Sequence, residues 1–444
     1  MALASRATAC TTMALLGVFL SGSGCDVGNR AGPRVLLVTV DTLRADHVGV
    51  YGGAVPTPAI DALAWAGVTV FGAFTPTPTT LPAHVSLLTG LHPWRHGVLD
   101  NAVPLPEGIP TVAERAQTAG LATAAFVSSY ILHPRFGLAR GFTDYRFEPG
   151  EAYVWRGRPR DAFWTLGAAT TDAALAWLAA HAREPFFLWV HYFDPHHPYE
   201  PPPGFERPPQ ERAPVTGKEL PRELKTFDAL ATALRGYRGE VAYVDAQIGR
   251  LVEGLRTLGV LDATAIVFTA DHGEGLGDHG ELQHGRTLFE ELVRVPLVVR
   301  APGIPAGRRL EGTVQLEDLA PTLLELLALD EPEGLDGRSL LPWLRGEALQ
   351  PPRTAVVGRR KPYPGEPDLF YVRHATAKWI GALGGEGLAY GLETDPRELH
   401  GAPAPTPAEL GPVVGGRSAA PLLDAESRRA LEALGYLGDD RPAD

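Results

Sequence analysis

Acidic and imidazole side chains follow three apolar segments of this sequence, at the point where each segment ends. PRVLLVTVD closes on Asp41, ATAIVFTAD closes on Asp271 with His272 next, and PFFLWVHYFD is followed by His196. A single aspartate after a strand is usually an Asx turn or a helix cap. Three such ends on one edge of a sheet instead predict a ligand site, because open parallel sheets bind ligands beyond the carboxyl ends of their strands.

A threonine before a further apolar segment gives this set of residues a candidate nucleophile. In TPTPTTLPAHVSLLTG, residues 75–90, Thr80 is expected to cap a helix that has Pro82 in its first turn and ends at Gly90. Capping is the common use of such a threonine. The N–H groups of a helix start also attract anions, so the Thr80 hydroxyl is also a candidate to attack a bound ester.

Carboxylates together with a neutral imidazole form a mixed oxygen and nitrogen ligand set. We expect one divalent cation on Asp41, Thr80, Asp271 and His272. Mn²⁺ or Zn²⁺ suits this set better than Ca²⁺, and Ca²⁺ or Mg²⁺ stays open as an alternative. The cation would lower the pKa of a coordinated hydroxyl, which threonine needs in order to act as a nucleophile.

The DHGE motif occurs twice, at 271–274 and at 278–281. Only the first copy directly ends a strand pattern, so the metal ligands are assigned to it and the second copy to a loop. A site with two cations, the second on Asp194, His196 and His284, is the alternative to the single-ion site.

The elements that must position these residues alternate along the chain. Continuous apolar runs are typical of strands buried in a parallel sheet, and four occur, at 33–41, 121–129, 185–194 and 263–271. Helical patterns lie at 59–67, at 111–120, from Thr170 onward and at about 224–258. This alternation predicts an α/β fold with a doubly wound, mostly parallel sheet flanked by helices. The pattern weakens afterwards, so residues 331–444 are expected to form a smaller C-terminal α+β subdomain.

Composition and the N-terminal segment bear on partners and location. A net charge of −12 over 444 residues argues against nucleic-acid binding, so an anionic substrate must be held locally.

Residues 1–25 combine one arginine, a short apolar stretch and small residues before Cys25, which predicts a signal peptide of the lipoprotein type. Cleavage to a soluble secreted protein is the alternative. We therefore expect an exported, periplasmic or envelope-anchored protein that contacts the membrane only through an N-terminal lipid anchor.

The motifs together resemble the sulfatase family of the alkaline phosphatase superfamily. They occur in the family's order and cover most of the chain after Val35: VTVDTLRADHVGVYG, TPTTLPAHVSLLTGLHPWRHGV, HYFDPHHPYEPP, FTADHGEGLGDHGELQHGRTLFEELVRVPLVV and GLDGRSLLPWL. The resemblance implies an alkaline-phosphatase-like sandwich, with a catalytic domain at 33–330 and a small C-terminal sheet subdomain at 331–444. It also implies a hydrolase of sulfate or phosphate esters.

The resemblance also implies roles for individual residues. The family's metal aspartate falls on Asp41, its nucleophile on Thr80, and its later metal pair on Asp271 and His272. The histidine that contacts substrate in the family falls on His196. These positions coincide with the candidates that the strand ends provide.

Several residues depart from the family pattern, and these departures change the chemistry that we expect. Sulfatases carry Cys-x-Pro-x-Arg, whose cysteine becomes formylglycine, whereas this frame runs from Thr80 to His84, so no formylglycine is expected. Thr42 replaces the second aspartate of the usual pair, and Arg286 replaces the usual lysine. The residues expected to bind substrate are His84, His196, His284 and Arg286, of which His196 and Arg286 are also expected to act in catalysis with Thr80.

The threonine also bears on which ester is cleaved. A threonine ester cannot collapse to an aldehyde as a formylglycine hydrate does, so water must hydrolyse it or an acceptor must take the group. This favours cleavage of a small phosphoester, phosphodiester or phosphonate through a Thr80 intermediate. The alternatives are an arylsulfatase-like sulfuric ester hydrolase, transfer of a head group to an envelope glycan or lipid, and a non-catalytic envelope binding protein.

Overall fold

The computed structural model describes residues 32–150, 153–155, 158–160, 163–206, 227–361, 363, 365–411 and 424–434. The expected signal peptide, with Cys25, lies outside these residues. Within them, no helix combines the length and the apolar character needed to cross a membrane.

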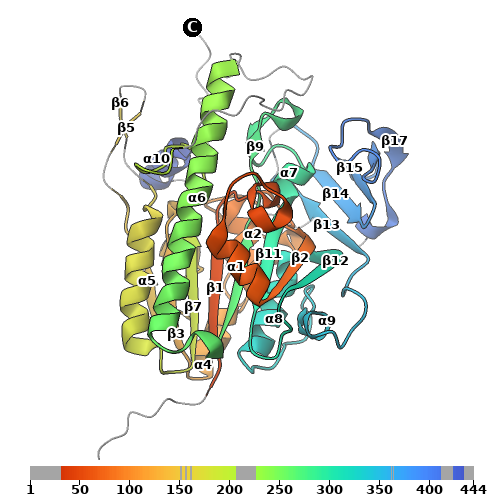
Figure 1. Cartoon of the computed structure of the whole chain (residues 1–444). Helices are drawn as coiled ribbons and strands as arrows, with labels where there is room; N and C mark the ends of the chain where they lie inside the picture. The colour runs from red at the N-terminus through yellow and green to blue at the C-terminus, as the bar shows by residue number, and fades with distance from the viewer. Residues whose placement is uncertain are drawn as a thin grey trace, which may run out of the picture.

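The centre of the molecule is an eight-stranded sheet in the order β12-β2-β11-β8-β1-β7-β3-β4 (Figure 1). Neighbouring strands run parallel, except that β11 is antiparallel to both β2 and β8. The strands are β1 (Arg34–Val40), β2 (Val68–Phe74), β3 (Ala122–Val127), β4 (Asp144–Arg146), β7 (Phe186–Tyr192), β8 (Thr264–Ala270), β11 (Arg294–Arg300) and β12 (Arg308–Gln315). The predicted mostly parallel sheet is confirmed, and all four predicted strands belong to it.

The register of the three central strands sets the position of the candidate site. Val40, the last residue of β1, lies opposite Tyr192 at the end of β7 and opposite Ala270 at the end of β8. All seven residues of each of these strands are buried, because helices cover both faces of the sheet. The polar residues that follow the strands therefore emerge at one level of one sheet edge.

Helices cover the sheet in two layers, as Figure 1 shows. One layer holds α1 (Pro58–Ala66), α5 (Gly167–His181) and α6 (Phe227–Thr257), in which α6 contacts both of the others. The other holds α2 (Thr80–Thr89), α4 (Val112–Thr118) and α8 (Leu319–Leu326), which also contact one another. The helical segments predicted from the sequence are present, and the three-layer α/β sandwich is confirmed.

A second, antiparallel sheet follows in the C-terminal region, in the order β13-β14-β15-β16-β17. Its strands are β13 (Ala355–Arg359), β14 (Leu369–His374), β15 (Ala377–Ala382), β16 (Glu386–Gly391) and β17 (Ala402–Pro405). It has apolar clusters of its own, one of which includes Tyr371 together with Phe74 at the end of β2. The N–H of Arg359 also donates to the Pro76 carbonyl at 2.8 Å, so this sheet is attached beside the segment that leads into α2.

Other parts of the region after residue 330 pack on the large domain. Leu341 of α9 (Leu341–Arg345) and Leu431 of α10 (Ala425–Ala433) belong to the main hydrophobic core. The remaining short elements are α3 (Pro93–His96), α7 (Glu290–Val293), the strand pair β5 (Tyr153–Trp155) and β6 (Arg158–Arg160), and the strand pair β9 (Gly275–Leu276) and β10 (Leu282–Gln283).

Candidate active site

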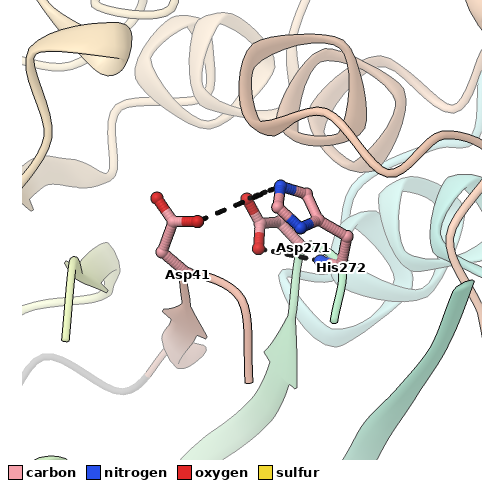
Figure 2. A group of neighbouring side chains, drawn as sticks. All are labelled: Asp41, Asp271 and His272. Atoms are coloured by element: carbon pink, nitrogen blue, oxygen red, sulfur yellow. Dashed lines mark hydrogen bonds and ion pairs between the residues drawn. The ribbon is translucent and has the colours of Figure 1, made fainter. Parts of the chain in front are cut away.

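Two carboxylates and an imidazole meet at the carboxyl ends of β1 and β8. Asp41, Asp271 and His272 are all fully buried and offer ligand atoms within 4.8 Å of one another (Figure 2). His272 Nε2 lies 4.0 Å from Asp41 Oδ1 and 3.5 Å from Asp271 Oδ2. Burial, and then the charges of Asp271 and Glu274, raise the pKa of Asp41 well above its usual range. Burial also raises the pKa of Asp271.

The unpaired atoms of this cluster fit a divalent cation. Both carboxylate oxygens of Asp41, Oδ2 of Asp271 and Oγ of Thr42 are buried without a hydrogen-bond partner. Buried carboxylates in this state are costly unless they coordinate a metal or pair with a cation. Within the part of the chain that the structure describes, this is the one group of three or more such side chains with metal-ligand spacing.

Backbone contacts orient the cluster from outside. The N–H groups of Thr42 and His272 donate to Asp271 Oδ1 at 3.2 and 2.8 Å, which leaves Oδ2 directed away from them. His272 Nδ1 lies 2.9 Å from the Gly273 carbonyl and donates to it, so Nε2 carries the lone pair that faces Asp41. Burial, followed by the charge of His284, lowers the pKa of His272 and keeps this ring neutral.

Thr80 lies beside the cluster, and its position in the helix differs from the prediction. The cap of α2 is Thr79, whose backbone is extended at φ −148°, and Thr80 is the first helical residue. The Thr80 side chain is fully buried, and its Oγ lies 3.4 Å from His272 Nε2. Pro82 occupies the first turn and Gly90, at φ +73°, ends the helix as predicted. The hydroxyl of Thr80 is therefore directed to the cluster and does not cap the helix.

His84, predicted to bind substrate, is engaged by the protein at both ring nitrogens. Its Nδ1 donates to the Thr80 carbonyl at 2.8 Å, and its Nε2 lies 3.1 Å from Thr39 Oγ. Thr39 Oγ also accepts from Trp189 Nε1 at 2.9 Å, so the hydroxyl donates to His84. Burial lowers the pKa of His84 to about 4. This geometry makes His84 a support for the backbone of Thr80, in place of the expected substrate contact.

His196 and His284 lie next to the cluster. The His284 ring is 4.3 Å from that of His272 and 5.1 Å from that of His196, centroid to centroid. His196 stacks on Phe193 and donates from Nδ1 to the His197 carbonyl, whereas His284 Nδ1 lies 3.1 Å from Glu274 Oε1. Burial lowers the pKa of both imidazoles; the second cause is the charge of His284 for His196 and the charge of Lys361 for His284. The structure thus brings the two predicted substrate histidines together.

Arg286 is placed differently from the histidines. It is exposed, and its guanidinium carbon lies 5.0 Å from the centre of the Tyr363 ring. Its carbonyl accepts from Arg360 at 3.2 Å. No contact among the described residues joins Arg286 to Thr80 or to the metal cluster, so its predicted catalytic role has no direct geometric support.

The geometry gives little support to the alternative site with a second cation. Asp194 is buried, and its Oδ2 accepts the N–H of Gly167 at 3.1 Å, at the start of α5. Burial raises the pKa of Asp194 to about 6. Asp194, His196 and His284 do not meet the ligand spacing that Asp41, Asp271 and His272 meet among the described residues.

Two further polar residues of the site were missed in the sequence. Asn101 accepts the N–H of Leu81 at the start of α2 through Oδ1 at 3.0 Å, while its Nδ2 is buried without a partner. Glu274 is fully buried beside His284, and burial raises its pKa to about 8. Glu274 closes the first DHGE motif, which was a signal in the sequence. Asn101 lies in a loop with no pattern of its own, and only the tertiary contact with α2 reveals it.

Comparison with known proteins agrees with this geometry. The sulfatase family model matches residues 33–329, and the model for the C-terminal region of N-sulphoglucosamine sulphohydrolase matches residues 277–403. A choline-sulfatase of Rhizobium meliloti is 28% identical over 83% of this chain and 81% of its own length. A multifunctional alkaline phosphatase superfamily protein of Trinickia caryophylli is 28% identical over 70% of this chain and 77% of its own.

Solved structures extend the comparison to the fold. The phosphonate monoester hydrolase of Agrobacterium radiobacter superposes with a TM-score of 0.73 at 26% identity, covering 91% of this chain and 96% of that one. Both sulfatases and phosphonate hydrolases therefore share this architecture, and sulfatase-family enzymes bind a divalent metal, for which Asp41, Asp271 and His272 provide a matching ligand set. With its catalytic region matched almost from end to end, this chain belongs to the sulfatase family within the alkaline phosphatase superfamily, as a hydrolase of sulfate or phosphate esters.

Proposed function

We propose that this chain is a metal-dependent hydrolase that cleaves a phosphoester, phosphodiester or phosphonate through a covalent intermediate on Thr80. The observation that carries the proposal is the place of the Thr80 hydroxyl. It is fully buried at the start of α2 and lies 3.4 Å from His272 Nε2, beside three carboxylate oxygens that have no hydrogen-bond partner.

Asp41, Asp271 and His272 would hold the cation, and the hydroxyls of Thr42 and Thr80 lie next to them. Mn²⁺ or Zn²⁺ suits these ligands best. When bound, the cation lowers the pKa of a neighbouring hydroxyl and neutralises charge on the ester oxygens. The neutral His272 ring supports this arrangement, because a protonated ring would repel a cation.

In the proposed reaction, Thr80 Oγ forms a bond to phosphorus while the bond from phosphorus to the leaving oxygen breaks. The hydroxyl proton leaves Thr80, and the departing oxygen takes up a proton. Water then attacks phosphorus, the bond to Thr80 Oγ breaks, and the hydroxyl is restored. The Nδ2 group of Asn101, buried at the start of α2 without a hydrogen-bond partner, can donate a hydrogen bond to an ester oxygen. His196 and His284 lie beside His272 and would contact the bound ester.

We prefer a phosphorus ester over a sulfate ester as the substrate because the proposed nucleophile is a threonine. A phosphothreonine can be opened by water, whereas the usual sulfatase route depends on a formylglycine that threonine cannot provide. The similarity to a phosphonate monoester hydrolase supports this preference. The similarity to a choline-sulfatase favours the second candidate, a sulfuric ester hydrolase that uses the same cluster. We also propose, from the N-terminal segment alone, that the protein is exported.

Activity of the purified protein with added Mn²⁺ or Zn²⁺ tests the proposal on four nitrophenyl esters: a phosphate monoester, a phosphate diester, a phosphonate and a sulfate. Thr80→Ala should abolish turnover of the phosphorus esters, and Thr80→Ser should retain part of it. Thr89→Ala, at the far end of the same helix, is the control for folding. Acid quenching should trap the transferred group on Thr80 of the wild type. Turnover that survives Thr80→Ala, or that is confined to the sulfate, would refute the phosphothreonine route.

A further inference from the structure

A group of cations stands beside the candidate site in a chain that is otherwise acidic. Arg359, Arg360 and Lys361 follow one another at the end of β13, and Arg286 lies next to them. The whole chain carries a net charge of −12, so four cations gathered in one place are a local exception. Three of them, Arg359, Arg360 and Lys361, are at most 9% exposed.

This group, named the cationic cluster below, is fixed close to Thr80. The N–H of Arg359 donates to the Pro76 carbonyl, four residues before the nucleophile. A Cβ atom placed on Gly285 would lie 3.4 Å from Tyr363 Oη, 3.8 Å from the Pro78 carbonyl oxygen and 3.9 Å from Lys361 Cε. The cluster, the segment before α2 and the loop that carries His284 therefore meet at one place.

Tyr363 lies at the centre of the cluster. Arg286 Cζ, Arg360 Cζ and Lys361 Nζ each lie 5.0 Å from the centre of its ring. An aromatic face attracts each cation, and three cations around one ring repel one another, so the arrangement gains from an anion between them.

Carboxylates in the protein balance only part of this charge. Arg359 pairs with Asp368 at 3.2 Å and Arg360 with Glu366 at 2.7 Å. Lys361 Nζ lies 3.4 Å from Asp100 Oδ1, and Asp100 directly precedes Asn101. Arg286 has no carboxylate partner among the described residues and is exposed to solvent. The cluster thus carries one more positive charge than its paired carboxylates neutralise.

Lys361 also lies beside the candidate site. A Cβ atom placed on Gly285 would lie 3.9 Å from Lys361 Cε, and Gly285 directly follows His284. The His284 ring lies 4.3 Å from that of His272, centroid to centroid. An anion bound by Lys361 would therefore lie next to the ester being cleaved.

We propose that the cationic cluster binds a second anionic group of the substrate, a carboxylate, sulfate or phosphate, through Lys361 and Arg286 on the face of Tyr363. This inference rests on the proposed function, which supplies the position of the cleaved ester. It narrows the substrate class to esters that carry a further negative charge away from the reacting atom, and it makes Lys361 a specificity-determining residue supplied by the C-terminal sheet.

Calorimetric titration with two non-hydrolysable probes tests the proposal. Phenylphosphonate and 4-carboxyphenylphosphonate differ only in the second charge, and both are titrated into the full chain loaded with Mn²⁺. The carboxylate should tighten Kd about tenfold in the wild type, as one charge-assisted contact would. Lys361→Gln should remove this preference and Lys361→Arg should retain it. Arg309→Gln is the matched control, because Arg309 also lies over an aromatic ring, Phe71, but on the edge strand β12.

Equal affinity of the two probes for the wild type, or an unchanged preference in Lys361→Gln, would overturn the inference. Binding does not require Thr80 as a nucleophile, so Thr80→Ala should keep the full preference for the carboxylated probe. Failure of the proposed function would appear differently, as absence of Thr80-dependent turnover with the probe preference intact. The two proposals can therefore fail separately.

Discussion

Replacing one buried carboxylate should stabilise the metal-free protein and abolish its stabilisation by metal. Asp41→Asn removes a charge that has no hydrogen-bond partner on either oxygen and whose nearest ionisable neighbours are the neutral His191 and His272 rings and Asp271. In the metal-free wild type this charge opposes folding. Asn keeps the shape of the side chain without the charge, so the variant should be more stable than the wild type when both are free of metal.

The magnitude follows from the pKa of Asp41 and from the binding equilibrium. Because the folded pKa lies above the unfolded value of about 3.9, the metal-free wild type loses stability as pH rises from about 4 through the raised pKa. Each pKa unit corresponds to about 1.4 kcal/mol, so the metal-free variant should gain this amount for every unit by which the folded pKa of Asp41 exceeds the unfolded one, up to pH 8. A cation at 100 times its Kd should stabilise the wild type by about 2.7 kcal/mol and leave the variant unchanged.

Thermal unfolding at pH 8, after dialysis against chelator and with or without Mn²⁺, measures both effects. Asp278→Asn is the matched control, because Asp278 opens the second DHGE copy and pairs with Arg44 at 2.6 Å. That variant should lose stability and keep the response to Mn²⁺. The reasoning is refuted if metal-free Asp41→Asn is less stable than the wild type and still gains as much from Mn²⁺.

Two further predictions concern neighbouring residues. Asn101→Asp keeps the acceptor for the Leu81 N–H but loses the buried Nδ2 donor. The kcat/KM should therefore fall about 100-fold with little change in Tm. An unchanged kcat/KM would show that Asn101 does not act in the site. Burial alone would lower the pKa of His279, but the hydrogen bond to Glu291 together with the charges of Glu291 and Glu398 raises it. The His279–Glu291 pair should make its full contribution to the stability of the folded state below about pH 6.5, and this contribution should decline as pH rises through the folded pKa of His279. His279→Gln should abolish the corresponding decline of Tm with pH.

Much of the candidate site could be predicted from short-range sequence. A short continuous apolar run is typical of a strand covered on both faces, and a polar residue directly after such a strand lies at the edge of the sheet. Parallel pairing then brings Asp41 and Asp271 to the same level without further information. The direction of β11 could not be predicted in this way, because an apolar run such as RVPLVVR has the same pattern in either direction.

The tertiary structure decided which side chains act together at the start of α2. Local preferences made Thr80 the cap, but the extended backbone falls on Thr79, and the buried hydroxyl of Thr80 is directed to His272 instead. Asn101 and Lys361 reach the same place from distant segments, held there by Leu81 and by the docking of β13 on Pro76. Such contacts depend on packing between elements far apart in sequence, and no local pattern of residue types encodes them. The strand ends are thus determined by the sequence alone, and the partners that surround them by the packing of whole sheets and helices.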